Sequence, residues 1–198
     1  MSTRDEILGR VRRHQPAAVP LPEWPAFARG DLGHAAPFEA FAEALQRMGG
    51  QVAEVPADGD LGLWLRKRFP DAKVVCSAVP EVTGNRPLDA VKHPRELEDV
   101  DVGIVRAAFG VAETGSVLLT ETELQVEALG FLAQHLVVLL DPSRIVATLH
   151  DAYRSPLFTQ ARYTILMTGP SATADIEGVL IHGAQGIRSL TVVPLAAA

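Results

Sequence analysis

The sequence contains one cysteine, Cys76, in 198 residues. A single thiol cannot form an internal disulfide, and alone it cannot hold an iron–sulfur cluster or a cysteine-type zinc site. Cys76 lies in the apolar segment 73–77, a predicted strand, so we interpret it as a small buried residue rather than a nucleophile. We therefore expect no cofactor and no metal in this chain, and a reducing compartment.

Basic residues are outnumbered, with 18 Lys and Arg against 24 Asp and Glu and a net charge of −6. General nucleic-acid binding needs a basic face that displaces counterions, so we expect no nucleic-acid partner. Long apolar runs are also missing, because the longest strongly apolar stretch, residues 136–140, is far shorter than the roughly 20 residues of a membrane-spanning helix. No apolar segment of signal-peptide length follows the charged N-terminus. We therefore expect a soluble, cytoplasmic protein without a membrane span.

Familiar catalytic motifs are missing too. The chain has neither the glycine series and lysine of a phosphate-binding loop nor the G-x-S-x-G turn of a serine hydrolase. Its six histidines show no metalloprotease spacing, and we interpret His135 and His182, at the ends of predicted elements, as structural. Aromatic residues make up only 6% of the chain and are scattered, so we predict no stacking surface for bases or sugars.

What remains is the composition of an ordinary globular protein, with 47% apolar and 21% charged residues. Residues 3–14 have the capping-box spacing and the narrow apolar stripe of a helix. Four prolines follow within ten residues, which favours an extended connector, because proline fixes φ and removes a hydrogen-bond donor. We therefore divide the chain into residues 1–30, a helix with a Pro-rich connector, and residues 31–198, a folded α/β domain.

Helix and strand patterns alternate in the larger part and are followed by closely spaced strands. The predicted helices cover residues 37–48, 61–69, 141–153 and 172–182. The predicted strands cover residues 51–55, 73–77, 102–107, 116–120, 135–140, 163–168 and 190–193. This order predicts the α/β class, as a three-layer unit with a mixed β-sheet flanked by helices.

The segment 167–177 joins an apolar strand to a predicted helix through a Gly-Pro turn followed by hydroxyl side chains. The free N–H groups at a helix N-terminus favour an anion, and Ser171 and Thr173 would add hydroxyl donors. The alternative is that Ser171 or Thr173 simply caps the helix, with Asp175 in its first turn.

Glu113 stands between two predicted strands, in the sequence Ala-Glu-Thr-Gly-Ser. A carboxylate at such a glycine-containing bend can act as a base or nucleophile, and the alternative is a solvated loop carboxylate. A basic partner would come from a distant part of the chain, such as Arg86 or Arg188. Because ligand sites gather beyond the ends of apolar strands, we expect Glu113 and residues 169–173 to lie side by side at one rim of the sheet.

Several blocks of the sequence together match a pattern that covers most of the chain. They are Val-Ala-Glu-Thr-Gly-Ser at 111–116, His-Leu-Val-Val at 135–138, Gly-Pro-Ser-Ala-Thr-Ala-Asp-Ile-Glu at 169–177, and two glycines before the last strand. With these blocks the chain resembles the lactate utilization protein C family, the LUD domain. The resemblance implies a NagB/RpiA/CoA-transferase-like fold, similar to the sugar-isomerase and CoA-transferase superfamily. It also implies a role in bacterial oxidation of lactate to pyruvate, with two separate iron–sulfur proteins that carry the clusters.

The residue patterns and the resemblance together define a candidate site. Glu113 is its candidate catalytic residue, and a small anionic ligand is its expected occupant. The glycine pair before the last strand would let the backbone approach a ligand, the alternative being a plain turn after a helix. The candidate ligand-binding residues are Thr114, Gly115, Gly169, Pro170, Ser171, Thr173, Asp175, Glu177, Gly183 and Gly186.

The sequence departs from the family pattern at two places. Family members usually have His-Gly-Pro in the last glycine turn, where this chain has Gln185-Gly186-Ile187, and a basic residue in the region where this chain has the acidic segment 121–127. If either basic group helps to hold an anion, this chain binds a different ligand or binds it more weakly. We favour an accessory subunit of lactate oxidation. The alternatives are a Glu113-dependent enzyme of the CoA-transferase or sugar-phosphate isomerase type, and an ATP-dependent enzyme of the folate cyclo-ligase type.

Overall fold

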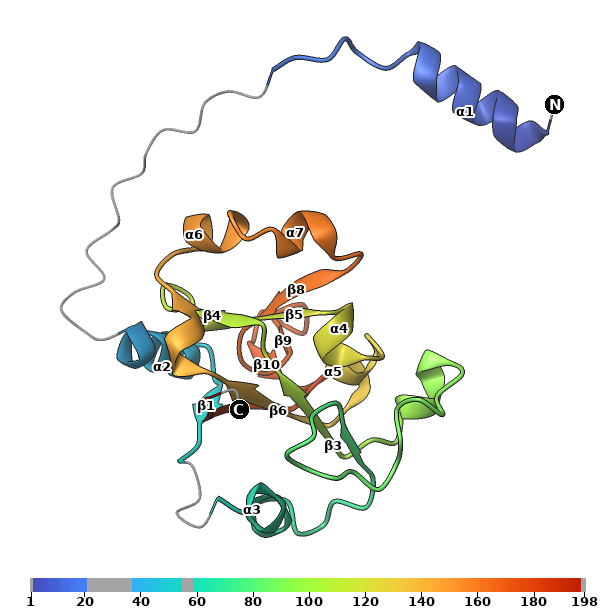
Figure 1. Ribbon diagram of the computed structural model, residues 1–198. Coiled ribbons are helices and arrows are strands. Elements are labelled where there is room, and N and C mark those ends of the chain that lie inside the picture. Colours follow the sequence, from blue (N-terminus) through green and yellow to red (C-terminus); the bar gives the residue numbers. More distant parts are fainter. Residues whose placement is uncertain (1, 21–36, 55–58, 197–198) are drawn as a thin grey trace. The chain divides into compact units, whose positions relative to one another are not determined.

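The computed structural model describes residues 2–20, 37–54 and 59–196, and the chain divides into two compact units, residues 1–30 and 31–198 (Figure 1). The first unit contains helix α1 (Thr3–Arg13). Ser2 caps it, because the Ser2 hydroxyl accepts the Asp5 N–H at 3.3 Å while the Asp5 carboxylate accepts the Ser2 N–H at 3.2 Å. The capping box therefore lies one residue earlier than the Thr3–Glu6 spacing suggested. None of the α1 residues is buried.

Helix α1 is expected to exchange its amide hydrogens far faster than strand β6 (His135–Leu140). Isolated helices of this length are marginal in water, and α1 buries no apolar side chain that would stabilise it, whereas five of the six β6 residues are buried. Hydrogen exchange of the full chain, read by mass spectrometry, measures this directly. Equal protection of α1 and β6 would show that α1 is packed in solution.

The larger unit is built on a five-stranded parallel sheet, in the order β1 (Gln51–Val52), β11 (Ser189–Pro194), β6, β3 (Val102–Arg106) and β2 (Val75–Ser77). Strands buried on both faces of a parallel sheet read as continuous apolar runs, as β6 does. Its side chains alternate between two cores. Leu136, Val138 and Leu140 enter the main core, and Val137 and Leu139 enter a second core shared with α3 (Leu61–Arg68).

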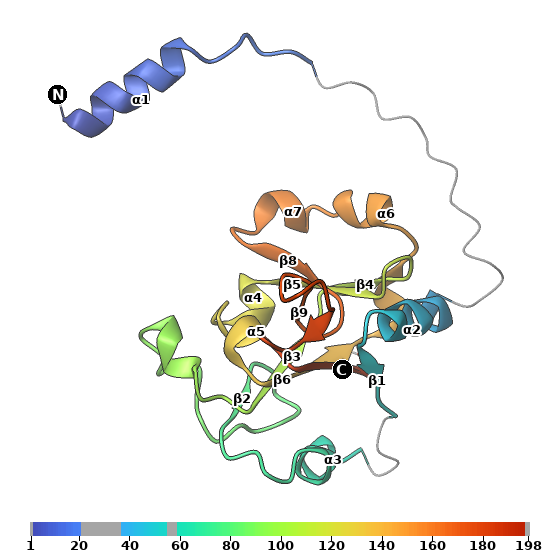
Figure 2. The same ribbon diagram turned by 180° about the vertical axis from the view of Figure 1, so that it is seen from behind.

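A second, mixed sheet contains the order β7 (Ile145–Val146), β4 (Phe109–Val111), β5 (Ser116–Thr120) and β8 (Thr164–Met167). Strand β5 also alternates, with Val117 and Leu119 in the main core and Leu118 in a third core next to Ala152 of α6 (Leu149–Tyr153). Figures 1 and 2 show the resulting layers, with α3 below the parallel sheet, and with α6 and α7 (Leu157–Gln160) above the mixed sheet. The predicted α/β class is confirmed, with the strands divided between two sheets.

Helix α2 (Pro37–Arg47) buries Phe41, Ala44 and Leu45, and Phe41 and Leu45 belong to the main core. The other elements not yet described are short. They are the 3-10 helices η1 (Pro94–Leu97) and η2 (Pro142–Arg144), α4 (Glu121–Leu124), α5 (Leu129–Leu132), and the paired strands β9 (Ala172–Thr173) and β10 (Ile181–His182). In the described part of the chain, no helix has the length and apolar character needed to cross a bilayer.

The predicted helix over residues 172–182 is wrong. These residues form a β-hairpin, in which Thr173 pairs with Ile181 and Ala172 with His182. Glu177 and Gly178 have positive φ angles of 54° and 70°, and this left-handed backbone cannot continue a right-handed helix. The predicted helix over 141–153 is also divided, because Ile145 and Val146 pair with β4 and leave only η2 and α6 helical.

Candidate functional site

Two of the predicted site segments meet where β5 begins and β8 ends. The Ser116 hydroxyl is hydrogen-bonded to the Thr168 hydroxyl, and it lies 2.7 Å from the Thr114 hydroxyl. Ser116 is buried, and its position follows from the antiparallel pairing of Val117 with Met167. The three hydroxyl groups therefore tie the turn before β5 to the turn after β8.

The C-terminal end of α2 packs against both of these turns. Gly115 has a φ of 67°, and a Cβ atom there would lie 2.1 Å from the backbone nitrogen of Leu45. Gly169 also has a φ of 67°, and its Cβ would lie 2.3 Å from the carbonyl oxygen of Met48. Each position thus needs glycine both for its backbone angle and for the close approach of the helix. Both glycines were predicted to bind a ligand, and both lie against the C-terminal end of α2.

The Glu113 carboxylate faces the start of α6. Its Oε2 atom accepts the N–H of Leu149 at 2.8 Å, and its backbone N–H donates to the carbonyl of Ala147 at 3.0 Å. The first N–H groups of a helix have no partner within the helix, and the helix dipole favours a negative charge there. Glu113 therefore stabilises the N-terminus of α6. Its predicted distant partner Arg86 is instead paired with Asp99, and the catalytic role of Glu113 stays a prediction.

Ser171 is hydrogen-bonded to the last glycine turn, residues 183–187. Its N–H donates to the carbonyl of Ile187 at 2.9 Å, its hydroxyl donates to the carbonyl of Gln185, and its own carbonyl accepts the N–H of Gly183 at 2.7 Å. A Cβ on Gly186 would lie 3.0 Å from the Ser171 Cβ. The expected anion site at a helix N-terminus is not formed here, because the chain continues into a hairpin and both donors of Ser171 bind carbonyl groups.

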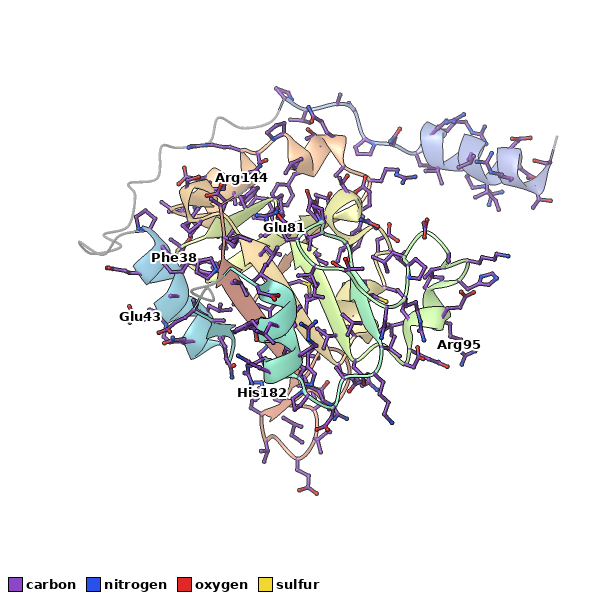
Figure 3. All side chains as sticks on the ribbon, turned by 60° about the horizontal axis from the view of Figure 1, so that its bottom comes forward. Phe38, Glu43, Glu81, Arg95, Arg144 and His182 are labelled. Carbon is purple, nitrogen blue, oxygen red and sulfur yellow. The ribbon has the colours of Figure 1, made fainter. Side chains whose placement is uncertain are left out.

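The hairpin between β9 and β10 carries Asp175 and Glu177, which are both exposed. The Thr173 hydroxyl accepts the Asp175 N–H at 3.2 Å, a bond local to the hairpin. The same tip exposes three apolar side chains, Ile176, Val179 and Leu180, at 49%, 60% and 61%. We call these three residues the hairpin tip. His182, which ends β10, is exposed as well (Figure 3).

Two carboxylates of the acidic segment 121–127 accept hydrogen bonds from backbone N–H groups. Glu121 accepts the N–H groups of Arg162 and Tyr163 at 3.0 and 3.1 Å, and these bonds hold the pKa of its carboxyl below the ordinary value. Glu123 accepts the N–H of Thr120 at 2.8 Å within the cap of α4. The first of these carboxylates thus fixes the chain where it enters β8, a contact that its position in the sequence does not reveal.

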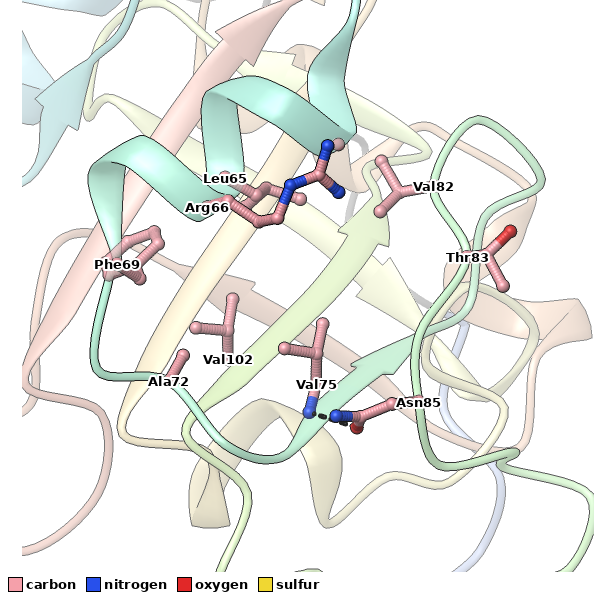
Figure 4. A pocket seen from close by; sticks show the side chains of 10 residues that line it. Leu65, Arg66, Phe69, Ala72, Val75, Val82, Thr83, Asn85 and Val102 are labelled. Carbon is pink, nitrogen blue, oxygen red and sulfur yellow. Dashed lines mark hydrogen bonds between the residues drawn. The ribbon is translucent and has the colours of Figure 1, made fainter.

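The larger unit contains several cavities, of which three bear on the site. One of about 270 Å³ runs along the edge strand β8 and includes residues 169–171 and 185–187, so it contains part of the predicted site. A second, of about 350 Å³, lies between α3, β2 and β3 (Figure 4). Its floor is apolar, with Arg66 above it and with Asn85 hydrogen-bonded to the Val75 N–H at 2.8 Å. It contains none of the predicted site residues.

The third cavity, of about 520 Å³, lies at the amino ends of the parallel strands and includes His135, Arg68 and Arg188. Sequence reasoning missed it because its residues come from separate segments. His135 was interpreted as structural, and Arg188 entered only as a partner for Glu113. Among the residues with described positions, no group of three or more His, Cys, Asp or Glu side chains is arranged to hold a metal ion.

The fold is that of an α/β protein with a parallel central sheet flanked by helices (Figure 1). The family model of the LUD domain matches residues 86–194, more than half of the chain, and the chain belongs to the LUD domain family. It is 25% identical over 160 residues to an uncharacterized protein of Neisseria meningitidis serogroup B, a match that covers 79% of this chain and 66% of that protein.

The solved structures add one likeness. The crystal structure of a DUF162 family protein from Deinococcus radiodurans superposes with a TM-score of 0.63 at 18% sequence identity. The superposition covers 80% of this chain and 95% of that one. At this identity the likeness establishes the fold.

Proposed function

We propose that this LUD protein is an accessory subunit in the bacterial oxidation of lactate to pyruvate, acting with separate iron–sulfur proteins. The family membership supports the pathway. The observation that carries the accessory role is the hairpin tip, because Ile176, in the block 169–177, and Val179 and Leu180, just after it, are exposed to water. Clustered exposed apolar side chains are typical of surfaces that bind another protein.

Cys76 fits the same role. Its side chain is fully buried in the main core, and burial raises the pKa of its thiol, so it is held as a neutral thiol. Iron–sulfur clusters are held by thiolates. The clusters of the proposed complex would therefore be ligated by cysteines of the partner proteins, and the hairpin tip would bring this subunit to one of them.

Growth on lactate tests the proposal. In the bacterium that carries this gene, its deletion should abolish growth on L-lactate as sole carbon source and leave growth on pyruvate intact. The wild-type gene should restore growth. A variant with Ile176→Ser, Val179→Ser and Leu180→Ser should not restore it, although the protein keeps the wild-type midpoint of thermal unfolding, because the exchanged side chains contribute little to the core.

Tyr153→Ser is the matched control, since Tyr153 is 62% exposed on α6 and lies outside the hairpin. This variant should restore growth on lactate. Normal growth of the deletion strain on lactate would overturn the proposed pathway. Restoration by the hairpin-tip variant together with failure of Glu113→Gln would overturn the accessory role in favour of a Glu113-dependent reaction.

A further inference from the structure

The amino ends of the parallel strands form a second site, apart from the hairpin tip. Ser189, His135 and Val102 are aligned in register as the first residues of β11, β6 and β3. The cavity of about 520 Å³ at this edge is lined by Arg68, Asp101, Gln134, His135, Arg188 and Ser189, together with Asp71 and nearby apolar groups. Polar groups from several segments thus converge in one hollow.

Arg68 lines the hollow and is held in place by two contacts. Its guanidinium lies 5.5 Å from the centre of the Phe69 ring, and that ring lies 4.9 Å from the His135 ring. Its Nη2 atom donates to the Gln51 side chain at the start of β1. A guanidinium stacked on an aromatic face keeps its remaining N–H groups available to a ligand.

Arg188 also lines the hollow, and it follows the last glycine turn in the chain. Its backbone N–H donates to the Gln134 carbonyl at 2.7 Å, and a Cβ on Gly183 would lie 2.9 Å from the Arg188 Cγ. Its guanidinium makes no hydrogen bond or ion pair with any residue whose position is described. Arg106, at the opposite edge of the sheet, is different, because it is paired with Glu81. Gly183 therefore makes room for an arginine whose guanidinium is left without a bonded partner among the described residues.

His135 lines the same cavity as the two arginines and is partly buried, with its Nδ1 atom 2.8 Å from the Ser189 hydroxyl. Burial is the largest cause that lowers the pKa of His135, and the charges of Arg188 and Arg68 lower it further. Asp101 acts in the opposite direction and more weakly, and its carboxylate accepts the N–H groups of Lys73 and Val74. The local field at the ring is thus positive although the lining includes Asp71 and Asp101.

We propose that this pocket binds the oxyanion group of a small metabolite, a phosphoryl or carboxylate group, between the guanidinium groups of Arg68 and Arg188. Planar guanidinium groups bind such oxyanions through paired, charge-assisted hydrogen bonds. The Ser189 hydroxyl and the Gln134 amide supply neutral donors beside them. A bound oxyanion would also favour the charged form of His135, so binding should strengthen as the pH falls.

Thermal unfolding of the full chain tests this with inorganic phosphate, L-lactate and acetate as probes, each at constant ionic strength set with chloride. At least one probe should raise the unfolding midpoint of the wild type. Arg188→Gln and Arg68→Gln should each weaken that binding on the order of ten- to a hundredfold. Arg154→Gln, an exposed arginine on the far side of the mixed sheet at the end of α6, is the control and should bind like the wild type. The most effective probe distinguishes a phosphoryl from a carboxylate ligand.

A second readout keeps the test valid if one arginine variant fails to fold. Sulfate keeps its charge between pH 5 and 8, so it isolates the titration of His135. In NMR titrations, sulfate should raise the pKa of His135 in the wild type and bind more tightly at pH 6 than at pH 8. The proposal fails if all probes stabilise the wild type and Arg188→Gln equally, or if sulfate leaves the His135 titration unchanged. Neither outcome touches the lactate-growth test, which depends on the hairpin tip.

Discussion

Gly115→Ala is expected to destabilise the protein by more than about 4 kcal/mol, enough to prevent stable folding in a domain of ordinary stability. The new Cβ would lie 2.1 Å from the Leu45 nitrogen and 2.5 Å from the Leu45 Cα. These are backbone atoms inside α2, so the clash cannot be relieved by turning a side chain. Either α2 or the turn before β5 would have to move, and the packing of Leu45 and Phe41 in the main core would be lost with it.

Gly59→Ala is the matched control. Gly59 has nearly the same backbone angle, a φ of 69° against 67° for Gly115, but a Cβ there meets no described residue within 4 Å. The free energy of unfolding of this variant should fall only by the cost of an alanine in the left-handed region, about 1–2 kcal/mol. In a protein of this size that lowers the melting temperature by roughly 2–8 °C, whereas Gly115→Ala should lower it far more or leave the protein insoluble. Similar melting temperatures for the two variants would contradict the packing of α2 against this turn.

The parts of the fold that the sequence predicted well are those whose signals are local. Residues 116–120 and 135–140 form strands with the predicted bounds, because continuous apolar runs are the pattern of strands buried on both faces. Helix α2 begins at Pro37 as predicted, and the chain leaves it just before two glycines. Strand β4 was missed because its three residues lie in a segment read as a glycine-containing bend.

The error over residues 172–182 has a different cause. Ile176, Val179 and Leu180 are spaced like one face of a helix, and that spacing alone produced the helix prediction. In the structure these side chains are exposed, so the pattern does not report a buried face. The positive φ angle of Glu177 belongs to the turn, and the sequence does not indicate it because this residue is not a glycine.

The cavity at the amino ends of the strands was beyond local reasoning for topological reasons. Arg68, His135 and Arg188 are separated by more than fifty residues at each step. The parallel pairing of β11 with β6 brings His135 and Arg188 to one edge, and the end of α3 adds Arg68. Glu113 and residues 169–173 were predicted to lie side by side because both follow apolar strands. The Ser116–Thr168 bond brings the neighbouring turns together, while the Glu113 carboxylate faces α6.

Gly50 and Leu45 are expected to show strong energetic coupling. A Cβ on Gly50 would lie 2.2 Å from Cδ1 and 2.7 Å from Cγ of Leu45, atoms of a side chain that is fully buried and has little room to turn. Gly50→Ala alone should therefore be severely destabilising. Leu45→Ala alone should cost about 2–5 kcal/mol, the usual cost of truncating a buried leucine.

The double variant Gly50→Ala, Leu45→Ala should lose less stability than the sum of the two, by on the order of 1–3 kcal/mol, because the truncation removes the two atoms that the new methyl group meets. The next contact, with the Gly169 Cα at 3.2 Å, needs only a small adjustment. Chemical denaturation of the four proteins of the cycle measures the coupling. Leu45→Ala combined with Gly59→Ala is the control and should be additive within about 0.5 kcal/mol. Additive losses in the Gly50 cycle would mean that the strain at Gly50 comes from its backbone neighbours, and that Leu45 is not the residue that holds the end of α2 against the glycine turns.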